Sequence, residues 1–88
     1  MRVRVRYRGR VQGVGFRATA RAVAAEHVLS GFVRNEPDGS VLLELQGEPA
    51  EVEACLDGLA RRMGSRILER DCTPCPERAD ERGFRIAY

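Results

Sequence analysis

Residues 2 to 8 alternate strictly between arginine and an apolar side chain, and this pattern restricts the fold of the chain more than any other. Val3, Val5 and Tyr7 occupy one set of alternate positions, and four arginines occupy the other. Because successive side chains of a β-strand point to opposite faces, this period of two predicts a strand. Its apolar face should be buried, and its arginines should lie on an open face of the sheet.

Two later segments have the period of an α-helix. Apolar residues from Phe16 to Ala24 recur three and four positions apart, which predicts a first helix from about Phe16 to about His27. The second helix begins near Pro49, a residue suited to a first helical turn, and ends at Gly64. Its apolar positions follow the spacing i, i+3, i+4, i+7 and i+11: Val52, Cys55, Leu56, Leu59 and Met63.

Four further segments are predicted as strands. They cover residues 31–35, 40–46, 66–71 and 83–88, with a turn at Glu36–Gly39 and a loop from Thr73 to Arg82. The elements therefore follow the order β-α-β-β-α-β, plus a short terminal strand. This order predicts an α+β, ferredoxin-like split βαβ sandwich, in which two helices cover one face of an antiparallel sheet. A chain of 88 residues fits a single domain, residues 1–88.

The charged residues give little support for nucleic acid as a partner. The net charge is +2, from 15 cations and 13 acids, and every cation is arginine. A chain without lysine indicates a compositional bias, so the excess of arginine carries little weight. No apolar run approaches the ~18 residues of a transmembrane helix, and Met1 is followed by charged residues rather than by a signal peptide. We therefore expect a cytoplasmic protein with no membrane partner.

The three cysteines do not form a recognisable site. Their number is small and odd, unlike that of a disulfide-rich secreted fold. Cys72 and Cys75 form a CxxC pair in the predicted loop, which is open to three interpretations: incidental thiols, a reversible disulfide or half of a zinc site. Zinc would need two more ligands, and Cys55 and His27 do not lie at a matching spacing. We expect no metal and no cofactor.

Residues 9 to 17, GRVQGVGFR, place three glycines between the first strand and the first helix. Glycine lets consecutive backbone N–H groups turn inward and line a concave nest that suits an anion. The helix N-terminus adds its own unpaired N–H groups, and Arg17 adds a planar fork of donors that matches two phosphate oxygens. The loop is therefore a candidate phosphate cradle, although it matches neither the Walker A sequence nor GxGxxG.

A second motif surrounds Asn35, at the end of the second predicted strand. Asparagine is common at turns, so this residue alone indicates only local structure. The two motifs together, G-x-V-Q-G-V-G-F-R from Gly9 to Arg17 and G-F-V-x-N-x-x-D-G-x-V from Gly31 to Val41, resemble the acylphosphatase family. The resemblance extends over nearly the whole chain and is weakest over residues 65–82.

The resemblance implies an enzyme that hydrolyses acyl phosphates to a carboxylate and inorganic phosphate. It implies two catalytic residues: Arg17 holds the phosphoryl group, and Asn35 positions the attacking water. It also suggests that the substrate phosphate accepts the proton, without metal or cofactor. The expected phosphate-binding residues are those of the loop: Gln12, Gly13, Val14, Gly15, Phe16 and Arg17. For the side chain of Gln12, bracing the loop is the alternative role.

Two other functions stay open from the sequence. RNA-recognition modules share the predicted topology, but they stack bases on exposed sheet aromatics, whereas the open face of the first and third strands carries arginines, Leu42 and Glu44. Those arginines are expected to pair with acids such as Glu44. Similar domains also begin larger hydrogenase-maturation proteins, which implies a carbamoyl-phosphate-binding domain with weak or no catalysis. We expect instead a stand-alone monomer that acts on a small-molecule acyl phosphate.

Overall fold

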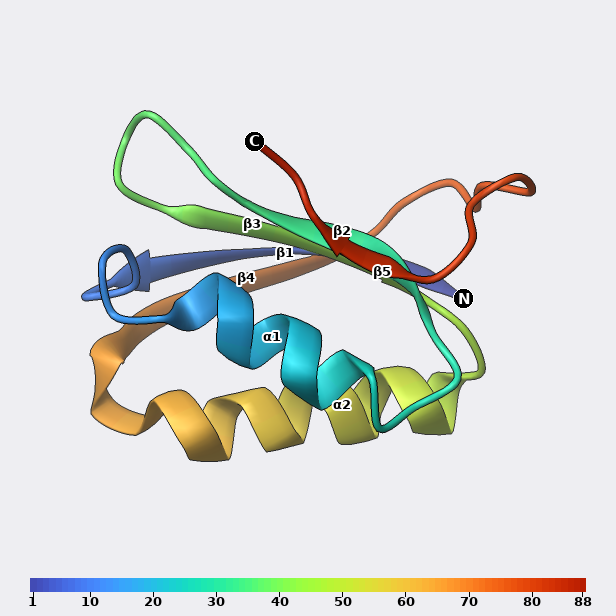
Figure 1. Ribbon diagram of the computed structural model, residues 1–88, viewed down its shortest axis with the longest axis horizontal. Helices are drawn as coiled ribbons and strands as arrows, with labels where there is room; N and C mark the ends of the chain where they lie inside the picture. Colours follow the sequence, from blue (N-terminus) through green and yellow to red (C-terminus); the bar gives the residue numbers. More distant parts are fainter.

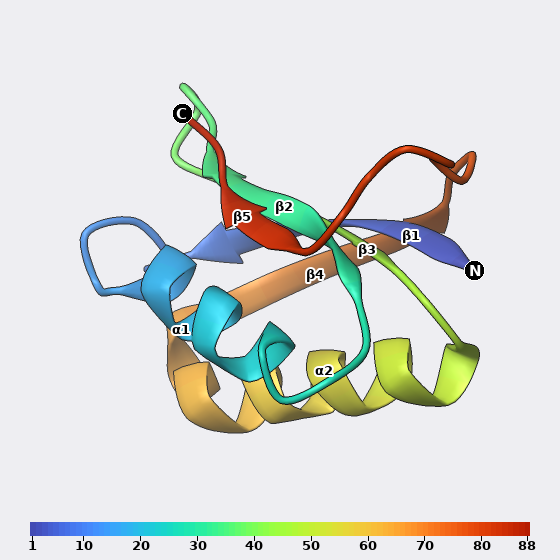
Figure 2. The ribbon, with the colours of Figure 1, turned by 45° about the vertical axis from the view of Figure 1, so that its right-hand side comes forward.

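The computed structural model describes residues 1–88. It contains one five-stranded sheet with the strand order β4-β1-β3-β2-β5, and both helices cover the same face (Figures 1 and 2). This arrangement confirms the predicted ferredoxin-like α+β fold. Neither helix has the length and apolar composition that a membrane crossing needs. In chain order the elements are β1 (Arg2–Gly9), α1 (Phe16–Ala24), β2 (Ser30–Asn35), β3 (Val41–Gln46), α2 (Pro49–Met63), a short 3-10 helix (Gly64–Arg66), β4 (Ile67–Pro74) and β5 (Phe84–Ile86).

The sheet is mixed: the predicted antiparallel pairing is confirmed for β1 to β4 and is wrong for β5. β1 pairs antiparallel with β3 and β4, and β2 pairs antiparallel with β3, but β5 runs parallel to β2, with Gly31 opposite Phe84. The reason lies in the connection before β5. β4 ends at Pro74 beside the start of β1, and residues 75–83 then cross to the other edge of the sheet and enter β5 where β2 begins (Figure 2). β5 therefore points the same way as β2.

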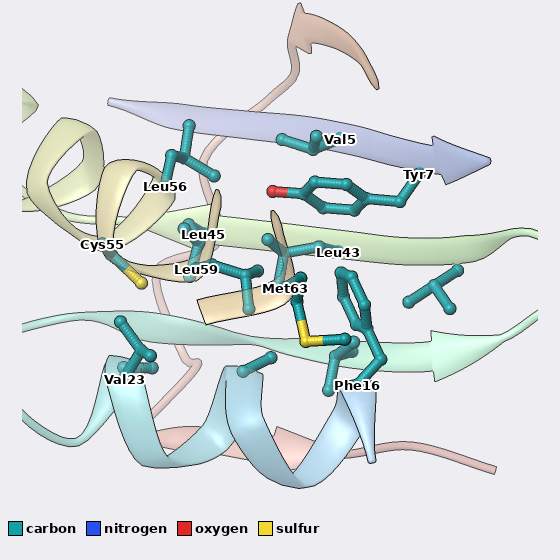
Figure 3. Packing of buried hydrophobic residues seen from close by; sticks show 14 of the residues in the cluster. Val5, Tyr7, Phe16, Val23, Leu43, Leu45, Cys55, Leu56, Leu59 and Met63 are labelled. Atoms are coloured by element: carbon teal, nitrogen blue, oxygen red, sulfur yellow. The ribbon is translucent and has the colours of Figure 1, made fainter. Parts of the chain in front are cut away.

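The core lies between the sheet and the two helices. Val3, Val5 and Tyr7, the apolar alternate positions of β1, are all buried, as their pattern predicts. Figure 3 shows Val5 and Tyr7 among side chains from β3 and both helices. The two helices lie close together at Gly58 of α2, where an added Cβ would be only 3.1 Å from Val23 Cγ1 of α1. Glycine at this position therefore allows α1 and α2 to pack closely.

α1 ends at Ala24, three residues before the predicted end near His27. The carboxylate of Glu51, on α2, accepts a hydrogen bond from the Val28 N–H at 3.0 Å and lies 3.1 Å from His27 Nδ1. These contacts hold the chain as it leaves α1 and turns toward β2. His27 therefore has a structural role.

β4 is longer than predicted. It extends from Ile67 to Pro74, whereas the sequence predicted a strand over residues 66–71 and a loop from Thr73. Pairing continues because β1 offers partners along its whole length, as far as Val3 opposite Pro74. The first residues of the predicted loop are therefore part of the sheet.

Cys72 lies within β4, so the prediction of a CxxC pair in a loop is wrong. Cys72 lies opposite Val5, whose side chain faces the helices, whereas Cys75 Sγ lies 3.9 Å from Glu44 Oε1 on the open face. The two thiols thus lie on opposite faces of the sheet, and all three cysteines are free. A disulfide between Cys72 and Cys75 would need the end of β4 to rearrange.

The open face of the sheet is covered at Arg2. This residue is only 2% exposed, so the prediction that all the β1 arginines lie on an open face is wrong at this position. Its Nε donates to Glu44 Oε1 at 2.8 Å, and its Nη1 donates at 2.6 Å to Oε1 of Glu81, in the crossing segment 75–83. Glu44 also accepts a hydrogen bond from Arg4 Nε at 2.8 Å, which confirms the predicted pairing of these arginines with Glu44.

Both carboxyl groups of this network have a lowered pKa. Burial by itself raises the pKa of Glu44, but the hydrogen bonds and charges of Arg2 and Arg4 outweigh it and hold the pKa below the usual 4.5. The hydrogen bond from Arg2 likewise lowers the pKa of Glu81. The ion pairs therefore tie the crossing segment to β1 and β3 at neutral pH.

An aromatic ring does lie on the open face, on the second strand and not on the first or third. Phe32, on β2, lies opposite Glu44. The ring is only 4% exposed, because the guanidinium groups of Arg34, Arg78 and Arg85 lie 5.5 to 5.9 Å from its centroid. It is therefore closed to stacking by a nucleic-acid base.

Replacing Glu44 by alanine should destabilise the protein strongly. The change leaves the buried Arg2 without one of its two carboxylate partners, and the loss of one partner of a buried pair costs about 3 kcal/mol. Urea unfolding at neutral pH measures this loss. Glu53→Ala is the matched control, because Glu53 lies exposed on α2 and should leave the free energy of unfolding unchanged. Equal losses in the two variants would contradict the role of Glu44.

Acid should weaken the same network. Because the folded protein lowers the pKa of Glu44 and Glu81, the unfolded chain binds more protons than the folded one below about pH 4.5. Stability that is present above this pH is then lost as the pH falls through the lowered pKa values. In urea unfolding across this pH range, the free energy of unfolding should fall less steeply with pH for Glu44→Gln than for the wild type, because the amide does not titrate. The same pH dependence in wild type and variant would refute this account.

Candidate functional site

The loop between β1 and α1 depends on two glycines in the left-handed region. Gly13 has a φ of 75° and Gly15 a φ of 77°, and Gly15 is the N-cap of α1. A Cβ at either position would meet nothing within 4 Å, so the restriction comes from the backbone angle and not from lack of space. Together these two angles turn the chain back toward the start of the helix.

This turn leaves a row of backbone N–H groups free. The first hydrogen bond of α1 runs from the Thr19 N–H to the Gly15 carbonyl oxygen, and no N–H from Gly13 to Ala18 donates to an acceptor within the protein. The positive end of the helix dipole lies at the same place, so the loop attracts an anion. The donors that an anion needs are therefore unoccupied here.

Arg17 and Asn35 line one pocket of about 180 Å³. Arg17 is the second residue of α1 and Asn35 is the last residue of β2, so the pocket joins the start of the helix to the end of a strand. Neither side chain makes a hydrogen bond or an ion pair within the protein. The rest of the lining consists of Val11, Gly13, Gly15, Phe16, Ala18, Ile86 and Tyr88.

The pocket has a positive charge, and no carboxylate or imidazole side chain lines it. Arg17 is its one charged side chain. An unpaired guanidinium beside free backbone N–H groups suits a phosphate group, because its planar donors can bind two oxygens at once. Asn35 adds a neutral amide, which can orient a water molecule without placing negative charge beside a phosphate.

Gln12 braces the loop against the hairpin formed by β2 and β3. Its Nε2 donates to the carbonyl oxygens of Glu36 at 2.8 Å and Ser40 at 2.9 Å, so both hydrogens of the amide are used. Of the two roles considered for this side chain, bracing is the one that the structure shows. Gln12 and Val14 lie outside the pocket lining, which leaves their backbone as the part that could reach a ligand.

The hairpin turn itself is fixed by Asp38. The Asp38 carboxylate accepts hydrogen bonds from the Ser40 hydroxyl at 2.6 Å and from the Ser40 N–H at 3.0 Å. These hydrogen bonds lower the pKa of Asp38 from 3.8 to about 2, and the bond from the Ser40 hydroxyl has the largest effect. The turn therefore keeps its geometry at neutral pH, and with it the end of β2 that carries Asn35.

Two residues of the lining come from the C-terminal strand and the residues after it, and the sequence did not indicate them. Ile86 and Tyr88 line the pocket, and the guanidinium carbon of Arg17 lies 5.4 Å from the centroid of the Tyr88 ring. The alternation of Phe84, Ile86 and Tyr88 predicts a strand. Its partner β2 lies far away in the sequence, so no local signal brings it to the site.

A ferredoxin-like fold whose pocket combines an unpaired arginine with free backbone amides has the features of a protein class suited to phosphorylated small molecules. The family model for acylphosphatase matches residues 3–86. An acylphosphatase from Geobacillus kaustophilus is 40% identical over 88 residues, which cover 99% of this chain and 94% of that relative. The chain therefore belongs to the acylphosphatase family, as its motifs predict.

Solved structures agree with this assignment. The crystal structure of acylphosphatase from Bacillus subtilis matches with a TM-score of 0.89 and 27% identity, over 99% of this chain and 98% of that one. The structure of T. kodakarensis HypF matches with a TM-score of 0.86 and 27% identity, over 100% of this chain but only 12% of that one. The same fold thus occurs both as a protein of similar length and as part of a longer one.

Replacing Gly15 by alanine should weaken phosphate binding. Alanine at this φ is strained by about 1 kcal/mol, and relief of the strain turns the neighbouring N–H groups away from their common centre. We expect the affinity for inorganic phosphate to fall at least about tenfold, as for the loss of one hydrogen bond to a charged group. An NMR titration of the backbone amides with phosphate measures it.

Gly64→Ala is the matched control for this change. Gly64 also has a positive φ, 54°, with nothing within 4 Å of a Cβ, but it lies at the end of α2 and not in the pocket lining. This variant should lose stability and keep its phosphate affinity. A Gly15→Ala protein that binds phosphate as tightly as wild type would refute the role of the loop.

Proposed function

We propose a mechanism for the acyl phosphate hydrolysis that membership of the family assigns to the chain. Arg17 and the N–H groups of the loop from Gln12 to Arg17 bind the phosphoryl group, and Asn35 positions the water that attacks it in line. The observation that carries this proposal is the pocket in which an unpaired guanidinium, free backbone N–H groups and a free amide meet. These are the groups that phosphoryl transfer needs for charge stabilisation and positioning.

The reaction consists of one displacement at phosphorus. The water oxygen forms a bond to phosphorus while the bond from phosphorus to the acyl oxygen breaks, and the electron pair of that bond leaves with the carboxylate. One proton of the water stays on the new P–OH group, and the other moves to a phosphoryl oxygen, which gives dihydrogen phosphate. We assign the substrate phosphate as proton acceptor because no acidic or imidazole side chain lines the pocket.

Arg17 and Asn35 have different tasks in this mechanism. The charge of Arg17 interacts with the phosphoryl group in the ground state and in the transition state, so its loss affects binding and turnover together. Asn35 interacts with the water, which matters only as the reaction proceeds. Loss of Asn35 therefore acts mainly on kcat.

A second candidate function is a domain that binds carbamoyl phosphate with weak or no catalysis. The observation that favours it is the match to T. kodakarensis HypF, in which a region with this fold is a small part of a long chain. Carbamoyl phosphate carries the same phosphoryl group as other acyl phosphates, so it would occupy the same pocket. The two candidates differ in whether turnover follows binding.

We further propose that the protein works as a monomer in the cytoplasm, on a small-molecule substrate and without nucleic acid. The small and odd number of cysteines, three in the chain, supports a reducing compartment. The burial of Phe32 supports the absence of a base-stacking surface on the sheet.

Hydrolysis of benzoyl phosphate in the presence of a chelator tests the proposal, with Arg17→Ala and Asn35→Ala beside the wild type. Arg17→Ala should abolish turnover and phosphate binding, whereas Asn35→Ala should lower kcat by about 10²-fold or more with little change in KM. Arg21→Ala is the control, because Arg21 is exposed on α1 and lies outside the pocket. It should behave as the wild type does.

The outcomes separate the two candidates. A folded wild type that binds phosphate but turns over neither benzoyl phosphate nor carbamoyl phosphate would favour a binding domain. Full activity of Arg17→Ala or of Asn35→Ala would refute the assigned roles.

A further inference from the structure

The chain continues past β5 in an extended form that brings Tyr88 to the pocket. The Ala87 N–H donates to the Val33 carbonyl oxygen at 2.8 Å, so pairing with β2 extends one residue beyond the strand. Ile86 lies opposite Val33, which belongs to the core, and Tyr88 follows two positions later. Because side chains alternate along an extended chain, Ile86 and Tyr88 face the same side, toward the start of α1.

The pocket lining therefore has two chemically different parts. The loop part, with Gly13, Gly15 and Arg17, offers backbone N–H groups and a cation. The part from the C-terminal segment, with Ile86 and Tyr88, offers apolar and aromatic surface. An acyl phosphate is divided in the same way, into an anionic phosphoryl group and an acyl group.

The ring of Tyr88 contacts Arg17 and is otherwise open to solvent. The Arg17 guanidinium lies over it at 5.4 Å from the ring centroid, a cation–π contact that joins the acyl side of the pocket to the phosphate side. Apart from this contact the residue is exposed, with a relative accessibility of 100%. A large exposed aromatic ring at the mouth of a pocket offers a face on which another planar apolar group can stack.

We propose that Tyr88 is the specificity-determining residue of this site and that, with Ile86, it forms an acyl-group subsite that favours aromatic acyl phosphates. The proposal rests on the proposed function, since it assigns the phosphoryl group to the loop and to Arg17. The aromatic ring of the acyl group stacks on Tyr88 while the phosphoryl group occupies the loop. A small acyl group such as acetyl gains little from this surface.

Binding of two non-hydrolysable analogues tests the proposal without requiring turnover. Phenacylphosphonate and acetonylphosphonate carry the same phosphonate and the same ketone, with a CH2 group in place of the bridging oxygen, and differ only in phenyl against methyl. Their Kd values are measured by NMR titration for the wild type, Tyr88→Ala and Tyr88→Phe. Leu68→Ala is the control, because it removes another exposed apolar side chain, 75% exposed on β4, that lies outside the pocket lining.

The wild type should bind the phenacyl compound more tightly than the acetonyl compound. In Tyr88→Ala the Kd of the acetonyl compound divided by the Kd of the phenacyl compound should fall by about three- to tenfold, the range expected for one aromatic pair. Tyr88→Phe keeps the ring and should keep the ratio, and Leu68→Ala should not change it. Tyr88 is exposed, so these changes should leave the fold intact.

Failure of this inference can be told apart from failure of the proposed function. A wild type that binds both analogues with equal Kd, or a Tyr88→Ala variant with the ratio of the wild type, overturns the subsite even where benzoyl phosphate is hydrolysed. A changed ratio in Tyr88→Ala beside a wild type that hydrolyses nothing supports the subsite and removes the catalytic proposal.

Discussion

The buried pairing of Arg2 with Glu44 and Glu81 joins parts of the chain that are far apart in sequence. Arg2 begins β1, Glu44 lies on β3, and Glu81 lies in the segment that leads to β5. Burying three charged groups is expensive unless their donors and acceptors are satisfied, and here Arg2 uses Nε, Nη1 and Nη2 for carboxylate or amide acceptors. The network therefore determines the path of the crossing segment, and this path brings β5 to the edge of β2.

Only the part of the candidate site that β5 supplies depends on this network; the other parts are placed by β1, α1 and β2. The loop from Gln12 to Arg17 is placed by β1 and α1, Asn35 by the end of β2, and Ile86 by β5. Gln12 connects the first two of these, because its amide holds the loop to the turn that follows β2. The side chains of Arg17 and Asn35 make no hydrogen bond or ion pair within the protein, so their positions come from the backbone that carries them.

Local patterns in the sequence predict the elements well and their neighbours less well. The alternation in β1, the apolar spacing of α2 and the glycines before Arg17 each act within a few residues, and the structure has the expected local form at all three. The parallel pairing of β5, the burial of Arg2 and the contact of Arg78 with Phe32 depend on residues 75–83, which have no regular pattern. The presence of Tyr88 at the site follows from that same pairing, and for this reason the sequence did not indicate it.

The shortness of β5 has a consequence for how a ligand enters and leaves. β5 has three residues and lies at the edge of the sheet, with hydrogen bonds to β2 alone. An edge strand of this length opens locally at a lower free energy than β1 and β3, which are paired on both sides. Its amide hydrogens should therefore exchange with solvent sooner than those of the central strands. Because Ile86 and Tyr88 line the pocket, we expect this side of the pocket to open locally more readily than the side formed by the loop between β1 and α1.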